Sequence, residues 1–220
     1  MSLKRKLLGL GALATVAAVS VVVMSASASN REGHWATPGH TSTTVHGLEK
    51  PSHTVEFAIE GAGKGVVCEA TLWDTAMTAE TEKELTFIPV YDKCKTTGGT
   101  VGEVKIKGNG CSLELYVAKG TTENTEQTAD FICGVGTSME VSELFCTLTI
   151  TTQKNLTGIT YKNITLTKEA VTVSFNTKLV IKADGACPMG TGTAGKLSGA
   201  LTIEAYDDAK KEIAPIKVVG

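Results

Sequence analysis

Apolar and polar residues alternate along most of the chain after residue 52. In Thr54–Glu60 the apolar residues Val55, Phe57 and Ile59 take every second position, which is the period of a half-buried strand. Similar segments recur at Gly65–Trp73, Leu85–Tyr91, Val101–Lys107, Cys111–Ala118, Thr128–Cys133, Cys146–Thr151, Ile159–Thr167, Val171–Ile181, Leu197–Tyr206 and Ile213–Val219. The pattern predicts about eleven strands and an all-β fold, a single antiparallel β-sandwich or barrel-like domain.

Turn residues punctuate these segments. Asn109-Gly110 lies between two alternating runs and predicts a type I′ hairpin, because both central positions of that turn need a positive φ. Asp184-Gly185 and Asp207-Asp208 predict further turns. One segment, Thr75–Lys83, has the Ala, Met and Glu content of a short helical turn.

The N-terminal segment has the composition of an export signal. Lys4-Arg5-Lys6 precedes the uncharged apolar run Leu7–Met24, and Ala26-x-Ala28 fits a cleavage site. We predict a signal peptide at 1–28, with a retained anchor as the alternative, since the run is near the lower length limit of a spanning helix. The polar residues 29–51, which include Gly and Pro, predict a flexible arm, and residues 52–220 form the β domain. The expected location is secreted and extracellular.

Charge excludes one class of partner. The net charge is −2, and removing the signal leaves 18 basic residues against 23 acidic ones, a net charge of −5. Nucleic-acid binding depends on neutralising phosphates with basic side chains, so nucleic acid is not an expected partner. No second long apolar stretch follows the signal, and no membrane partner is expected after cleavage. The predicted partner is an unknown extracellular ligand or surface.

Cysteine usage agrees with export. The chain has an even number of cysteines, no C-x-x-C pair, and no cysteine adjacent to a histidine, which favours disulfides over metal or redox chemistry. Six cysteines allow 15 connectivities. The six candidates are Cys68, Cys94, Cys111, Cys133, Cys146 and Cys187.

The positions of the cysteines on either side of single predicted strands favour one of the 15 connectivities. Cys94 and Cys111 flank one predicted strand, and Cys133 and Cys146 flank Met139–Val141. We therefore predict two local bridges, Cys94–Cys111 and Cys133–Cys146, with Cys68–Cys187 as the long-range bridge.

All four histidines fall in one short window, at spacings of six, six and seven residues. They are His34, His40, His46 and His53. Imidazoles grouped on a flexible segment are candidate ligands for Zn²⁺, Cu²⁺ or Ni²⁺, and a solvated linker is the alternative. Six-residue spacing matches neither a helical face nor a known ligand pair.

No catalytic motif is visible. Neither G-x-S-x-G nor H-E-x-x-H occurs, and every histidine lies near the predicted arm, so no catalytic residue and no cofactor is expected. Carbohydrate sites recruit exposed aromatic platforms, for which the candidates are Trp73, Tyr91, Tyr116, Tyr161 and Tyr206. The sequence predicts a non-enzymatic structural or binding module, with a carbohydrate-binding or carbohydrate-active jelly-roll-type domain as the alternative.

Several stretches support a wider resemblance. They are Gly65–Cys68, Pro89–Cys94, Gly108–Cys111, Leu156–Asn163 and Cys187–Thr193. Together they resemble an uncharacterised family of secreted, Thr-rich, disulfide-containing β-proteins common in actinobacteria. The resemblance covers most of the chain after residue 52 and implies export and a β fold. It assigns no activity and no catalytic residue.

Overall fold

The computed structural model describes residues 31–48, 54–60, 64–68, 70–97, 104–122, 124–164, 170–187 and 192–220. Every regular element in these ranges is a β-strand, which confirms the all-β prediction. The predicted signal peptide and His53 lie outside the described residues.

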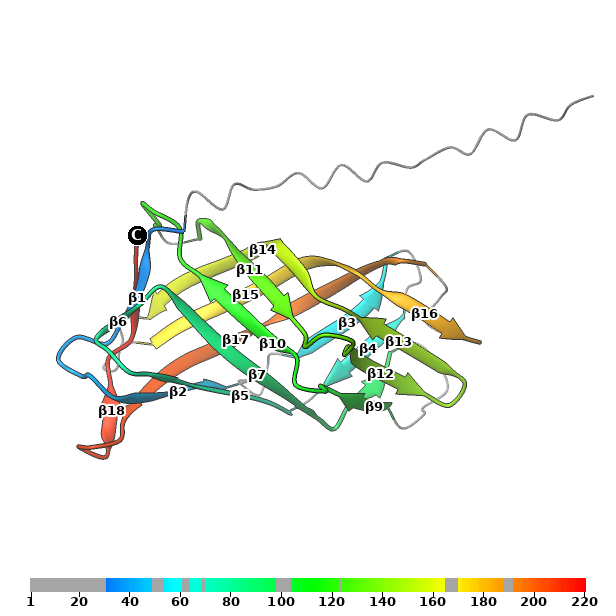
Figure 1. Ribbon diagram of the computed structural model, residues 1–220, viewed down its shortest axis with the longest axis horizontal. Helices are drawn as coiled ribbons and strands as arrows, with labels where there is room; N and C mark the ends of the chain where they lie inside the picture. Colours follow the sequence, from blue (N-terminus) through cyan, green and yellow to red (C-terminus); the bar gives the residue numbers. More distant parts are fainter. Residues whose placement is uncertain are drawn as a thin grey trace, which may run out of the picture.

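Eight antiparallel strands close into a barrel (Figure 1). In order around the barrel they are β15 (Ala170–Val180), β14 (Gln153–Ile164), β11 (Glu126–Ile132), β10 (Ser112–Tyr116), β7 (Glu84–Asp92), β5 (Ala70–Met77), β2 (Thr43–Leu48) and β17 (Ala194–Asp207). Pairing of β15 with β17 closes the ring, with Val171 opposite Ile203 and Val180 opposite Ala194. Of the two predicted architectures, the structure is the barrel.

Further strands extend both ends of the barrel, as Figure 1 shows. At one end (left in Figure 1) β1 (His34–Ala36) lies between β6 (Thr81–Glu82) and β19 (Lys217–Val219), and β18 (Glu212–Ala214) pairs with the end of β17. At the other end β17 also pairs with β3 (Val55–Ile59), which leads to β4 (Gly65–Cys68) and β8 (Lys95–Thr96). A separate four-stranded sheet at that end has the order β16 (Lys182–Gly185), β13 (Cys146–Ile150), β12 (Met139–Glu143) and β9 (Val104–Lys107).

The apolar side chains of the alternating segments fill the barrel. In β7, Leu85 and Phe87 are buried, whereas Thr86, Ile88 and Val90 face solvent. The other barrel strands contribute Leu, Ile, Val and Phe side chains to the same core. An apolar cavity of about 10 Å³ in this core has room for one water molecule at most. The interior is therefore a packed core.

The prediction of a flexible arm at 29–51 is wrong for the residues of this range that the structure describes. Residues 34–36 and 43–48 form β1 and β2, and Trp35 and Val45 are fully buried. The inward positions of β2 are Thr43, Val45 and Gly47, so only one of the three is apolar and the strand lacks the expected alternation. The barrel domain begins well before residue 52.

Two local predictions also need correction. The expected helical turn at Thr75–Lys83 is wrong, because β5 continues to Met77 and β6 begins at Thr81. The Asn109-Gly110 turn does form, with φ of 48° and 74°. However, the strands on its two sides belong to different sheets, since β9 pairs with β12 and β10 pairs with β7 and β11. The turn carries the chain from the four-stranded sheet to the barrel.

All six cysteines form disulfides, but the predicted connectivity is wrong. The bridges are Cys68–Cys94, Cys111–Cys133 and Cys146–Cys187. Strand register explains the first two bridges. Val67 pairs with Lys95, which puts Cys68 opposite Cys94, and Ser112 pairs with Ile132, which puts Cys111 opposite Cys133. Each bridge thus joins neighbouring chain segments.

Candidate functional site

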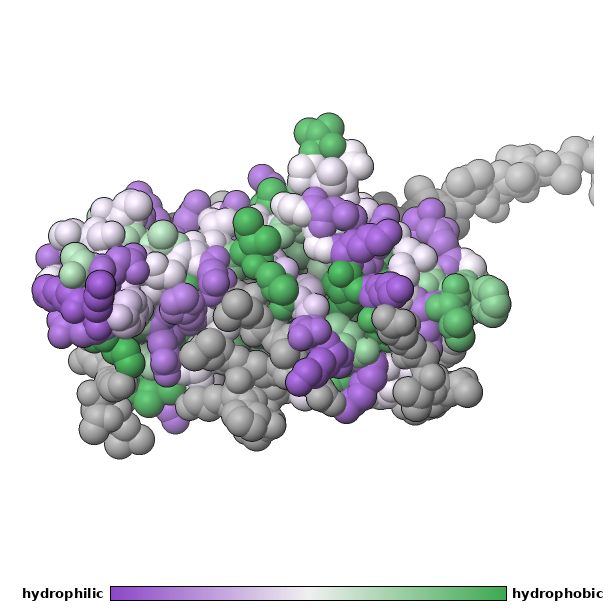
Figure 2. All heavy atoms as spheres, turned by 90° about the horizontal axis from the view of Figure 1, so that it is seen from below, coloured by the Kyte–Doolittle hydropathy of each residue, from purple (hydrophilic) through white to green (hydrophobic). Residues whose placement is uncertain are grey.

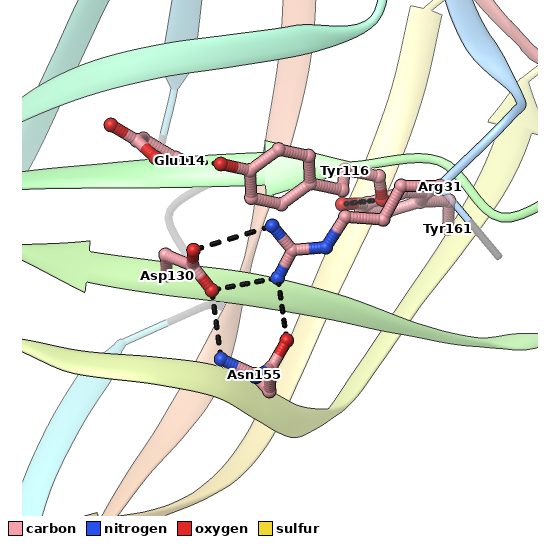
Figure 3. Close-up of polar contacts among 6 residues, drawn as sticks. All are labelled: Arg31, Glu114, Tyr116, Asp130, Asn155 and Tyr161. Atoms are coloured by element: carbon pink, nitrogen blue, oxygen red, sulfur yellow. Dashed lines mark hydrogen bonds and ion pairs between the residues drawn. The ribbon is translucent and has the colours of Figure 1, made fainter. Parts of the chain in front are cut away.

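A connected polar cluster lies on the outer wall of the barrel and centres on Arg31 (Figure 3). Its Nη2 donates to Asp130 Oδ1 at 2.7 Å and to Asn155 Oδ1 at 3.0 Å, and its Nη1 donates to Asp130 Oδ2 at 3.3 Å. The guanidinium carbon also lies 3.5 Å from the centre of the Tyr116 ring. A planar guanidinium suits both contacts, because it forms paired bonds to a carboxylate and stacks on aromatic rings.

An irregularity in the sheet shapes this cluster. The pairing of β11 with β14 shifts register between Ala129 and Phe131, and Asn155 there has a φ of 55°. The Asn155 N–H donates to Asp130 Oδ1 at 2.7 Å, so the carboxylate replaces a backbone partner at the bulge. Asp130 is buried and acceptor-rich, and Arg31 supplies the compensating charge.

Electrostatics keep Asp130 ionised. Burial alone raises the pKa of its carboxyl, but the hydrogen bond from Arg31, the Asn155 N–H and the nearby positive charge outweigh burial and leave the pKa below its ordinary value. The Tyr116 hydroxyl donates to Glu114 at 2.7 Å, and burial together with this carboxylate raises the pKa of Tyr116. Asp130 is therefore held ionised and Tyr116 is held protonated, so the cluster suits anchoring better than proton transfer.

Trp35 continues the same anchor inside the barrel. Its indole N–H donates to the Leu115 carbonyl at 3.2 Å, and its ring centre lies 4.9 Å from that of Tyr161. The Tyr161 hydroxyl in turn donates to the Tyr116 carbonyl at 3.0 Å. Arg31 on the outer wall and Trp35 in the interior therefore fix the N-terminal segment to the same end of β10.

We expect Arg31→Gln to lower the free energy of unfolding by about 2 kcal/mol at neutral pH, because a buried carboxylate loses its cation. Asp130 in the wild type contributes stability above the ordinary carboxyl pKa, and this contribution disappears as the pH falls through its lowered folded pKa. In the variant, burial is the dominant influence on the Asp130 carboxyl, and protonation at low pH removes the cost of burying its charge. The difference between the two proteins should therefore shrink between about pH 7 and pH 3 in urea denaturation.

Lys119→Gln is the matched control for that substitution. It removes an exposed ion pair with Glu32, at 2.7 Å, next to the same segment. Exposed pairs contribute little, so its stability should stay within about 0.5 kcal/mol of wild type at every pH. A pH-independent loss in Arg31→Gln would assign the cost to packing and contradict the ion-pair explanation.

The histidines do not form the predicted metal-binding group. His34 lies in β1, His40 Nδ1 is 2.5 Å from Asp207, and His46 Nδ1 is 2.9 Å from Asp74. Within the described ranges, no group of three or more His, Cys, Asp or Glu side chains is placed to hold a metal ion. For His34, His40 and His46 the grouped-chelate prediction is therefore wrong.

The His40–Asp207 pair has a structural role instead. The hydrogen bond from His40, followed by the backbone N–H of Lys210, lowers the pKa of Asp207. Asp207 Oδ1 also accepts from the N–H groups of Ala209 and Lys210, at 2.9 and 2.8 Å. The pair ties the β1–β2 connection to the turn after β17.

The tyrosines do not form the exposed aromatic platform that a carbohydrate site would use. Tyr116 and Tyr161 are buried, and Tyr91 and Tyr206 are half-buried. The side chain of Trp73 lies outside the described set. Among the aromatic side chains that are described, Phe145 alone is strongly exposed.

Phe145 belongs to an unusual hairpin tip. Glu143 pairs with Cys146, so Leu144 and Phe145 form a two-residue turn between β12 and β13. Leu144 has a φ of 38° and Phe145 does not have a positive φ, which is the sign pattern of a type II′ turn. That turn prefers glycine at its first central position. Leu144 and Phe145 are instead 82% and 79% exposed.

We expect Leu144→Gly to stabilise the protein by about 1 kcal/mol, because it removes side-chain strain at a positive φ. Thermal unfolding of the oxidised protein measures the change. Val135→Gly, at another fully exposed apolar side chain without a positive φ, is the control and should not stabilise. A loss of stability in Leu144→Gly would show that the leucine side chain packs favourably at the tip.

Fold and site together define a disulfide-bonded all-β protein built on a closed eight-stranded barrel. No protein-family model, no curated protein and no solved structure matches the chain. The resemblance to secreted actinobacterial proteins thus stays a prediction. In the described residues no helix is long and apolar enough to cross a bilayer.

Proposed function

We propose that this chain is an exported structural or binding module without catalytic activity. The filled barrel supports this proposal most directly, because its apolar cavity of about 10 Å³ is too small for an organic ligand. The charged groups of the Arg31 cluster are engaged in anchoring the N-terminal segment. Three disulfides fit an oxidising compartment outside the cytosol.

A binding screen of oxidised residues 29–220 against glycan and protein arrays tests the proposal. We expect a ligand to be retained without being changed, because the described polar groups are arranged for anchoring. Mass spectrometry of each retained ligand before and after incubation measures turnover. Any ligand that is hydrolysed or otherwise converted would contradict the non-catalytic assignment.

The alternative, a carbohydrate-binding or carbohydrate-active jelly-roll-type domain, has less support. Sugar rings pack on aromatic faces, and such platforms need at least two accessible rings. The four tyrosines are buried or half-buried, and the exposed Phe145 lies alone at a convex turn. Retention on the glycan array that survives removal of Phe145 would favour this alternative over a protein or surface partner.

A further inference from the structure

We propose that Leu144 and Phe145 insert into the interface of a lipid bilayer, giving a weak, reversible contact between this end of the protein and a membrane surface. This inference rests on the proposed binding function and names its partner, and it replaces the sequence-based expectation of no membrane partner with a reversible surface contact. The two side chains are adjacent and about four-fifths exposed. In Figure 2 a small hydrophobic group lies at the right-hand end, the end at which β12 and β13 lie in Figure 1, and other hydrophobic residues lie over the middle of the face.

The tip is held rigidly from behind. The Ala186 N–H donates to the Phe145 carbonyl at 3.0 Å, and the Cys146–Cys187 bridge joins the same two segments. Gly185, with a φ of 92°, permits the close approach, since a Cβ there would clash with the Phe145 carbonyl oxygen. Because the backbone is already fixed, burying the two side chains in a partner orders little additional structure.

The small size of the tip favours a bilayer over a protein partner. A stable complex of two proteins usually buries about 800 Å² on each side, far more than two side chains at a convex turn provide. A bilayer interface requires only that apolar groups reach below the headgroups. A second copy of this chain would need a larger complementary apolar surface than this tip offers.

The surrounding charges are compatible with this contact. The solvent face of the four-stranded sheet carries Lys105, Lys107 and Lys182 together with Glu140 and Asp184, a net charge of +1 in a chain of net charge −2. Lys107 pairs with Glu140 at 3.8 Å, and Lys182 pairs with Asp184 at 3.0 Å. The face neither repels nor strongly attracts anionic headgroups, so binding should depend mainly on apolar insertion.

Vesicle flotation with the oxidised protein tests the proposal. We expect partition onto phosphatidylcholine vesicles at about millimolar lipid, little changed by phosphatidylserine or by salt. The double variant Leu144→Gly/Phe145→Asn installs preferred type II′ residues and removes both apolar side chains, so it should stay folded and lose about tenfold or more of the partition. Phe145→Trp should retain partition, and its indole emission should shift to the blue with vesicles.

Ile88→Thr/Val90→Thr is the matched control. It removes two exposed apolar side chains from the outer face of β7 and keeps β-branched residues there, so partition should be unchanged. Absence of partition in the wild type, equal partition of the tip variant, or no emission shift in Phe145→Trp would overturn the proposal. So would a concentration-dependent dimer in lipid-free sedimentation that the tip variant abolishes, because the tip would then bind a second copy. The array screen reports on the broader binding function independently of vesicles.

Discussion

Reduction of the three disulfide bonds is expected to unfold the protein at room temperature. The bridges close loops with sequence separations of 26, 22 and 41 residues. In the chain-entropy model, loops of these lengths contribute about 3.4 to 3.9 kcal/mol each, or about 11 kcal/mol together. That sum is comparable with the whole stability of a typical domain, about 5 to 15 kcal/mol.

Circular dichroism and urea denaturation with and without dithiothreitol measure this effect, with alkylation to prevent reoxidation. The pair variant Cys146→Ser/Cys187→Ser should remain folded with a lower midpoint, because only the longest loop opens. Removing the Cys111–Cys133 bridge should cost slightly less, since its loop is shorter. A reduced protein that keeps a cooperative transition near the oxidised midpoint would show that the core alone holds the barrel.

The sequence predicts the strands well because the residues that face the core are apolar and alternate with polar residues along each strand. Segments such as Thr54–Glu60 and Val171–Ile181 coincide closely with β3 and β15. Alternation reports only that one face is buried, so it does not distinguish a sandwich from a barrel. The closure of the ring depends on β15 and β17 meeting along ten residue pairs, a long-range pairing that no local pattern encodes.

The predicted disulfide connectivity was wrong for the same physical reason, because local patterns do not encode which strands are neighbours. The predicted bridges assume that cysteines flanking one strand lie close together. In the structure the strands β9 and β12 leave the barrel for a separate sheet, so Cys94 and Cys111 have different neighbours. Connectivity follows strand adjacency, and adjacency is a property of the whole topology.

The Arg31 cluster was missed because its members are far apart in sequence. Arg31 is 99 residues from Asp130 and 124 from Asn155. A single arginine in a polar segment looks like a solvated charge, and Asp130 sits in a strand like many others. Alternation in β11 puts Asp130 on the same face as Thr128 and Ile132, away from Ala129 and Phe131, so no local pattern marks this carboxylate as buried.

Replacing Trp35 with alanine is expected to be the most damaging single substitution in the described core. Trp35 is fully buried, packs on Tyr161 and hydrogen-bonds the Leu115 carbonyl. Truncating a buried tryptophan costs about 3 to 5 kcal/mol, through lost burial and the cavity that remains. Urea denaturation of oxidised residues 29–220 should show this loss in the free energy of unfolding.

Two variants separate the contributions within that loss. Trp35→Phe keeps a ring at the end of the barrel but removes the indole N–H, and it should cost about 1 to 2 kcal/mol. Phe145→Ala truncates an exposed aromatic and should change stability by less than about 0.5 kcal/mol. If Trp35→Ala were no worse than Phe145→Ala, β1 would not pack as a cap on the barrel. Residues 31–36 would then behave as the flexible arm that the polar composition of 29–51 predicts.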